Sequence, residues 1–379
     1  MRSVSSASLA STPVVPTYPE CSAKYYMRNT KVTWDFSAPS GGGAVMSCSG
    51  DNVVFFSRGD RVHYKNIATG EEVGQLLRLR EGDGDLRVLK CAPGGDLLAV
   101  GTSTGLIQLW DIKARKKVVS WMHKKTVSAM AWNGDGGILT IGGEKGTIRH
   151  YDTRIGLKNI SGMKEQARKV TRHQGCITVL EWNVDGRIWA SGDSSGTVYC
   201  WDGNGKERVP LDVGEFVQRR KKMQHGGAIS ALAFCPWQPR LLATGDVEGV
   251  MQLWNVNPLN QHSNATTPGK LELGVPITSI HFSPHCKEIL TTHSCKLSPS
   301  SPSNSAITNN NTPTNLTNTN TRTRTTRDSA KEAIVGSVMN GAGTRIVVAN
   351  GEGKMGVVEV WAKRKEVKRV PSFLGATIR

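Results

Sequence analysis

Short apolar segments separated by turn residues recur along most of the chain, and the clearest example lies between His225 and Asn255. Its pattern predicts three strands, near 228–234, 241–245 and 250–254. Both faces of these strands are apolar, as expected for a sheet packed between two other sheets. Such a unit cannot bury its own faces, so the pattern predicts further copies.

Copies of the unit are recognised by how they end, with an apolar segment, an aromatic residue and usually an Asp. They end at Trp110-Asp111, Tyr151-Asp152, Trp201-Asp202, Trp254-Asn255 and Trp361-Ala362. A period of roughly 40–45 residues with a terminal Trp-Asp is typical of a WD-repeat β-propeller with about four strands per blade. The sequence therefore predicts an all-β, seven-bladed WD-repeat propeller, with insertions where the intervals are longer.

Two blades depart from the pattern. The first, expected from the strand around Trp34 onward, holds Lys65 at the Trp position. The sixth has strands at 277–282 and 288–292, followed by a Ser/Thr/Asn/Pro-rich insert with almost no apolar side chains. We therefore expect degenerate first and sixth blades. The predicted domains are a disordered arm over 1–24, a propeller over 25–361 with a disordered insert over 294–328, and a tail over 362–379.

Composition narrows the classes of partner. No stretch approaches the roughly 18 apolar residues of a membrane span, so no membrane contact is expected. The eight cysteines include no CxxC pair, which favours a reducing compartment. A formal net charge of +17 leaves open a basic scaffold for RNA or an acidic protein. Nucleic acid is not favoured, because the basic clusters at 164–172, 219–222 and 363–369 lack interleaved aromatic residues.

The polar residues within the blades are interpreted as structural. In the fifth blade His225, Thr244, Glu248 and Trp254 are expected to form one buried hydrogen-bond network. The His and Cys residues at 281–295 lack the closely spaced ligand pairs of a zinc site. No phosphate-binding loop or catalytic triad is marked by local sequence. We therefore expect no enzyme, no metal and no cofactor.

Three segments resemble a known family. They are Ala233–Gln238 with Leu242–Gly245, Leu98–Thr102 with Gln108–Asp111, and Ser283–Ile289. These segments resemble the Fizzy and Fizzy-related proteins, which activate the anaphase-promoting complex. The resemblance implies a non-catalytic adaptor of the nucleus and cytoplasm that brings degron-bearing substrates to this ubiquitin ligase during mitosis or meiosis. It also implies checkpoint inhibitors as partners.

The last two residues, Ile378 and Arg379, match the Ile-Arg ending of the family. The resemblance implies that this tail docks on a tetratricopeptide-repeat subunit of the ligase. A carboxylate, a guanidinium and a branched apolar side chain on a tether form a compact ligand for a groove.

The expected degron-reading positions differ from the family pattern. The family acid before the Trp of the first strand is replaced by Thr33, and Asp35 lies one pleat further on the same face. The Asn-x-Asn of the fourth blade is replaced by Ser194 and Gly196. A divergent activator with lost or altered degron reading is therefore a third hypothesis.

Overall fold

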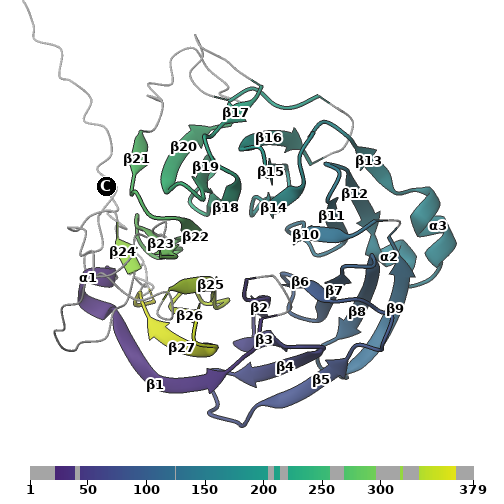
Figure 1. Cartoon of the computed structure of the whole chain (residues 1–379), viewed down its shortest axis with the longest axis horizontal. Coiled ribbons are helices and arrows are strands. Elements are labelled where there is room, and N and C mark those ends of the chain that lie inside the picture. The colour runs from purple at the N-terminus through teal and green to yellow at the C-terminus, as the bar shows by residue number, and fades with distance from the viewer. Residues whose placement is uncertain are drawn as a thin grey trace, which may run out of the picture.

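The sheets stand around a central axis as the blades of a ring (Figure 1). The computed structural model describes residues 22–38, 43–123, 125–203, 209–213, 221–256, 269–295, 316–318 and 333–363. Within these residues strands dominate and the helices are short. The predicted all-β propeller is confirmed.

Among the described residues, six sheets contain four antiparallel strands each. The first sheet consists of β2 (Met46–Cys48), β3 (Val53–Arg58), β4 (Arg61–Asn66) and β5 (Gly74–Arg78). The second consists of β6 (Leu86–Cys91), β7 (Leu97–Thr102), β8 (Leu106–Asp111) and β9 (Lys116–Met122). The third consists of β10 (Val127–Trp132), β11 (Ile138–Gly143), β12 (Ile148–Asp152) and β13 (Arg168–Val170). The next two are β14 (Ile177–Trp182), β15 (Ile188–Asp193), β16 (Thr197–Asp202) and β17 (Met223–Gln224); and β18 (Ile229–Cys235), β19 (Gln238–Asp246), β20 (Val250–Asn255) and β21 (Lys270–Glu272). The last is β1 (Arg28–Asp35), β27 (Lys354–Glu359), β26 (Arg345–Asn350) and β25 (Ile334–Met339).

A further sheet has three strands among the described residues, namely β22 (Ile277–Phe282), β23 (Ile289–His293) and β24 (Leu316–Asn318). β24 belongs to the insert that was expected to be disordered, and it pairs with β23 from Leu290↔Asn318 to Thr292↔Leu316. The expectation therefore does not hold for these three residues, and most of the insert lies outside the described residues. The sheet predicted as a degenerate first blade has all four strands, β2 to β5.

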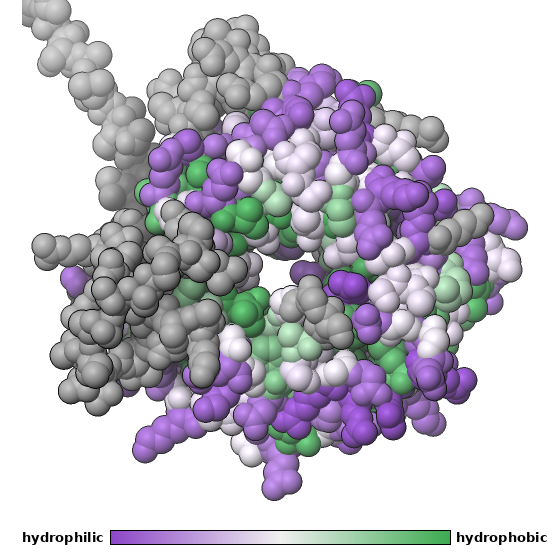
Figure 2. All heavy atoms as spheres, viewed as in Figure 1, coloured by the Kyte–Doolittle hydropathy of each residue, from purple (hydrophilic) through white to green (hydrophobic). Residues whose placement is uncertain are grey.

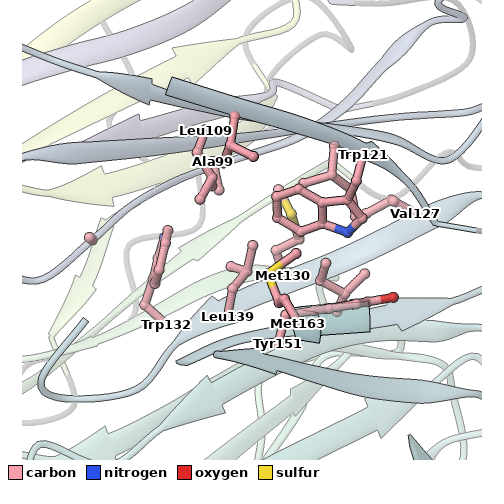
Figure 3. Packing of buried hydrophobic residues seen from close by; sticks show 13 residues of the cluster. Ala99, Leu109, Trp121, Val127, Met130, Trp132, Leu139, Tyr151 and Met163 are labelled. Carbon is pink, nitrogen blue, oxygen red and sulfur yellow. The ribbon is translucent and has the colours of Figure 1, made fainter. Parts of the chain in front are cut away.

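Burial follows the position of a strand in its sheet. The inner strands β15 and β18 are buried along nearly their whole length, whereas the outer strand β21 is exposed throughout. Both faces of each sheet pack against the neighbouring sheets of the ring. This packing explains why the inner strands are apolar on both faces. Figure 3 shows one such interface, where Trp121 of β9, Met130 of β10 and Tyr151 of β12 meet between two blades.

In the part of the chain that the structure describes, three short helices lie outside the sheets. They are α1 (Ala23–Tyr26), α2 (Thr153–Gly156) and α3 (Ile160–Glu165). α2 and α3 connect β12 to β13, and Met163 of α3 inserts into the core of Figure 3. The side chains of Asp152 and Asn159 cap the first turns of α2 and α3.

The ring is closed by its first strand. β1 pairs with β27 in the last sheet, with Trp34 opposite Met355 and Asp35 opposite Lys354. The prediction that this strand belongs to the first blade was therefore wrong. The two ends of the propeller are thus held together by main-chain hydrogen bonds, and this removes an exposed sheet edge.

Trp361 does not occupy the position predicted for it. In the fifth blade Trp254 lies on β20 opposite Leu242, and the corresponding residue of the last sheet is Val358, opposite Ile346. β27 ends at Glu359, so Trp361 lies beyond it. Its interpretation as the closing residue of a WD repeat was therefore wrong.

Candidate functional site

The predicted polar network of the fifth blade exists, but with a different acid. The Nδ1 atom of His225 lies 2.9 Å from Oδ2 of Asp246, and its Nε2 lies 2.7 Å from Oγ1 of Thr244. The indole of Trp254 donates to the same Oγ1 at 3.0 Å. Asp246 is buried, whereas Glu248 is exposed on the turn. The assignment of Glu248 to this network was therefore wrong, because the acid comes from the end of β19.

The fourth blade repeats this network. His173 lies 2.7 Å from Asp193 and 2.6 Å from Ser191, and Trp201 donates to Ser191 at 2.8 Å. Its acid, Asp193, lies at the end of β15, as Asp246 lies at the end of β19. The sequence contains a pattern that identifies this acid in both blades. An Asp directly follows Ser-Gly at position 193 and Thr-Gly at position 246.

Burial fixes the protonation of these histidines. It lowers the pKa of His225, and the hydrogen bond and charge of Asp246 oppose the shift without reversing it. A carboxylate can only accept, so Nδ1 of the neutral imidazole carries the hydrogen and Nε2 accepts from Thr244. Burial also lowers the pKa of His173, with Asp193 opposing in the same way. These residues hold adjacent strands in register and do not form a reactive site.

The two substrate-binding candidates on β1 lie on one face, as predicted. Thr33 and Asp35 are exposed, while Trp34 between them is buried against the first sheet. The carbonyl oxygen of Asp35 accepts two hydrogen bonds from the Arg58 guanidinium, at 2.9 and 2.7 Å. No side-chain hydrogen bond or ion pair is recorded for the Asp35 carboxylate among the described residues.

The two candidates of the fourth blade lie in the turn between β15 and β16. The hydroxyl of Ser194 accepts from the backbone of Cys176 at 3.1 Å, and the side chain is exposed. Gly196 has a φ of +78°, and a Cβ there would lie 2.6 Å from the carbonyl oxygen of His225. Gly196 is therefore required by the turn and has no side chain to offer to a ligand. β15 and β1 lie on different sides of the ring, so the two pairs do not form one site (Figure 1).

The first strands of the sheets surround a central channel, whose opening is visible in Figure 2. A cavity of about 380 Å³ lies among β2, β6 and β10, and one of about 250 Å³ lies at their other ends. Lys90 lines both cavities. Burial raises the pKa of Glu181 in the second cavity, and the charge of Lys90 opposes this shift. None of the candidate residues that the structure describes lines either cavity.

A buried carboxylate that sequence reasoning missed joins three parts of the chain. Glu288, which is 8% exposed, accepts hydrogen bonds from the Ser22 hydroxyl at 2.6 Å and from the Ala23 backbone at 2.9 Å. The indole of Trp361 donates to the same carboxylate at 2.9 Å. The partners lie far apart in sequence, so no local pattern points to them.

The described residues contain no group of three or more His, Cys, Asp or Glu that could hold a metal ion. The residues once considered for zinc point elsewhere, since His281 contacts Ser337 and His285 contacts the carbonyl of Ala342. No described helix is long and apolar enough to cross a membrane. The predicted docking residues Ile378 and Arg379 lie outside the described residues.

Comparisons with known proteins agree with this architecture. The family model described as "WD domain, G-beta repeat" matches residues 116–152 and 164–202. The first match spans β9 to β12 and the second includes β13 to β16. Each sequence repeat thus supplies the outer strand of one sheet and three strands of the next.

Curated relatives share about three residues in ten with the chain. WD repeat-containing protein slp1 of Schizosaccharomyces pombe is 29% identical over 58% of this chain and 41% of its own length. Anaphase-promoting complex subunit cdc20 of Dictyostelium discoideum is 29% identical over 56% and 40%. Meiotic fizzy-related protein 1 of S. pombe is 31% identical over 52% and 42%. The chain thus spans less than half the length of these relatives.

A chain in the solved structure titled "Crystal Structure of Mitotic Checkpoint Complex" has the same fold. The TM-score is 0.66 at 23% identity, over 96% of this chain and 99% of that chain. The relatives are named as WD-repeat proteins and cell-division cofactors. The chain matches the WD-repeat model in two segments and is similar in sequence to proteins named as slp1, cdc20 and fizzy-related protein 1.

Proposed function

We propose that this chain is a substrate-recruiting activator of the anaphase-promoting complex in cell-cycle control. The observation that carries the proposal is the sequence match to proteins named as subunits or cofactors of that complex. The propeller supplies a rigid ring of loops and grooves, which suits a protein that holds one partner against another. The proposed work is binding, without a chemical step.

Contact with the ligase is assigned to Ile378 and Arg379. Their Ile-Arg sequence supports docking into a groove of a tetratricopeptide-repeat subunit. A guanidinium forms paired hydrogen bonds with a carboxylate, and the isoleucine side chain adds apolar contact. Checkpoint proteins are proposed as further partners, and the nucleus and cytoplasm as the site of action.

Substrate binding is assigned to the propeller, with altered degron reading. Thr33 and Asp35 are exposed side by side on β1, which supports a role in holding a degron. At the second position Gly196 has no side chain and no room for one. This observation favours a divergent activator, in which Ser194 alone remains available for side-chain contact.

The sheet count supports seven blades. Six sheets have four strands and the seventh, β22 to β24, has three among the described residues. We assign this seventh sheet to the sixth blade, with β24 recruited from the insert. Lys65 at the Trp position makes the first blade degenerate in sequence while it keeps four strands.

The experiment that tests the proposal is substrate ubiquitination by the purified ligase. Adding the full chain to the ligase and a cell extract is expected to produce ubiquitin conjugates that the ligase alone does not form. A matched reaction uses the Thr33→Arg, Asp35→Arg double variant, which should lose conjugates while still binding the ligase. If the full chain adds no conjugate to any extract protein, the proposal is contradicted.

A further inference from the structure

The first strands of three neighbouring sheets bring a cation and a carboxyl group to one level of the central channel. Lys90 is the fifth residue of β6 and pairs with the third residue of β7, and Glu181 is the fifth of β14 and pairs with the third of β15. Ala131 occupies the same position on β10, and its short side chain leaves room between them. Figure 1 shows β6, β10 and β14 next to one another around the channel.

Both side chains line the cavity of about 250 Å³ at the C-terminal ends of these strands. Among its described lining residues, Lys90 supplies the one basic side chain and Glu181 the one acidic side chain. Trp132 and Met339 give the cavity an apolar wall. Its volume is below the roughly 300–1,000 Å³ of pockets for drug-sized ligands, so it suits a smaller molecule.

Neither of these two side chains has an oppositely charged partner among the described residues. No described carboxylate lies within 4.0 Å of the Lys90 ammonium, and no described cation lies within 4.0 Å of the Glu181 carboxylate. Lys90 and Glu181 therefore do not pair with each other, although the charge of Lys90 acts on the pKa of Glu181. Both side chains are partly exposed, so a solute in the channel can reach them.

Nearby titratable groups add no charge to this pair at neutral pH. Burial lowers the pKa of His281, the fifth residue of β22, to about 4, and its Nε2 lies 2.8 Å from the Ser337 hydroxyl. Burial raises the pKa of Cys48 and of Cys91, both in the cavity wall, to about 12, so the thiols keep their protons.

The environment of Glu181 favours a cation beside it. Burial raises the pKa of its carboxyl group, because the charged form loses contact with water. An ammonium group in contact with this carboxylate would stabilise the charged form, and a carboxylate in contact with Lys90 would do the same at the other pole. The cavity is thus complementary to a molecule with one charge of each sign.

We propose that this end of the channel binds a small zwitterion, a free α-amino acid with an apolar side chain. Its carboxylate pairs with Lys90, its ammonium pairs with Glu181, and its side chain packs against Trp132 and Met339. A simple anion would satisfy Lys90 alone and a simple amine Glu181 alone, whereas a zwitterion satisfies both. The site goes beyond the proposed function and does not depend on it.

The test is isothermal titration calorimetry of the purified full chain with L-valine and glycine. Two further probes each keep one half of valine: 3-methylbutanoate lacks the ammonium group, and 2-methylpropylamine lacks the carboxylate. L-Valine is expected to bind at least about tenfold more tightly than either half, because each half leaves one pole of the cavity unpaired. Glycine is expected to bind more weakly than L-valine, since it has no side chain for the apolar wall.

Matched variants separate this site from general charge. Lys90→Gln and Glu181→Gln should each weaken L-valine binding by about tenfold, roughly the effect of losing one charge-assisted contact. Lys116→Gln, on the exposed outer strand of the same sheet as Lys90, and Glu144→Gln, on the exposed wall of the other cavity, should change the affinity less than about twofold. Circular dichroism confirms that each variant is folded.

A charge exchange gives a second readout that loss of folding cannot imitate. The double variant Lys90→Glu, Glu181→Lys keeps one charge of each sign, so it should bind L-valine at least about tenfold more tightly than Lys90→Glu alone. In the parent chain, bound L-valine should lower the pKa of Glu181, measured by NMR, because the ammonium favours the carboxylate.

The proposal is overturned if neither L-valine nor glycine binds more tightly than about 1 mM. Equal affinity for 3-methylbutanoate would also overturn it, because Lys90 would then act as a simple anion site. Equal affinity for 2-methylpropylamine, or equal affinity of the Glu181→Gln and Glu144→Gln variants for L-valine, would remove the role of Glu181. The ligase is absent from these assays, so their results leave the proposed function unaffected.

Discussion

The indole of Trp361 donates a hydrogen bond of 2.9 Å to the carboxylate of Glu288, 73 residues earlier in the chain. The same carboxylate accepts from Ser22 and Ala23 at the start of α1. One buried side chain in the connection between β22 and β23 therefore holds both the segment entering β1 and the segment leaving β27. Because β1 closes the ring, Glu288 stabilises the closure from outside the sheet.

Replacing Glu288 by Gln is expected to lower the free energy of unfolding by about 1–3 kcal/mol. The amide offers one acceptor oxygen to three donors and turns an N–H group toward them. Urea unfolding measures the loss, and hydrogen exchange of β1 should increase. Glu352→Gln, on the exposed turn before β27, is the matched control and should stay within about 0.5 kcal/mol of the parent. Equal stability of the two variants would contradict the role of Glu288.

The acid of the fifth-blade network can be identified by a pair of substitutions. Asp246→Asn removes the charged acceptor of buried His225 and is expected to cost about 1–3 kcal/mol of unfolding free energy. Glu248→Gln changes an exposed side chain and should cost less than about 0.5 kcal/mol. Thermal and urea unfolding of both variants provide the comparison. A larger loss for Glu248→Gln would restore the assignment made from sequence.

Gly196→Ala is expected to destabilise the fourth blade by about 2 kcal/mol or more, from strain at positive φ together with a steric clash. The new Cβ would lie 2.6 Å from the His225 carbonyl and 2.7 Å from that of Gly227. Gly70→Ala separates the two causes, because Gly70 has a φ of +67° with nothing within 4 Å of its Cβ position. Gly70→Ala should cost about 1 kcal/mol, measured by urea unfolding. A tolerated Gly196→Ala would mean that the turn can open to hold a side chain.

Stability is expected to fall between pH 7 and pH 5. Burial lowers the pKa of His150 to about 3 and that of His123 to about 4, against 6.5 when unfolded. As the pH falls through 6.5, the unfolded chain binds protons at these histidines while the native chain does not. Each such histidine costs up to about 2 kcal/mol by pH 5. Glu181 acts in the opposite sense, because burial raises its pKa above that of the unfolded chain and the native state therefore takes up this proton first as the pH falls.

Urea unfolding at several pH values measures this dependence. His150→Gln should make the decline shallower, whatever its effect on stability at pH 7. A stability that is constant or rises on acidification to pH 5 would contradict the neutral state assigned to these histidines.

Features encoded within one repeat could be predicted from the sequence, and features that join distant segments could not. The strands of the fifth blade and the residues His225, Thr244 and Trp254 follow from local periodicity. The pairing of β1 with β27 does not, because a strand's own side chains leave its partner unspecified. Trp361 was misassigned for the same reason, since its position beyond β27 and its contact with Glu288 depend on how distant segments pair.

The arrangement of candidate site residues could be predicted only where it depends on the alternation of side chains along a single strand. Thr33 and Asp35 share a face because side chains alternate on a strand. Gly196 cannot be replaced by a residue with a side chain, because the carbonyl of His225 in the adjoining loop lies too close. The local sequence around Gly196 does not predict this contact.

The most direct test of the account is capture of the anaphase-promoting complex by the full chain and by a version without Ile378 and Arg379. Thr377→Ala is the matched tail control. We expect the full chain and the control to capture the complex, and the truncated version to lose most of it. If the truncated version captures as much as the full chain, the docking role of the tail is contradicted. If none captures it, the proposed function itself is contradicted.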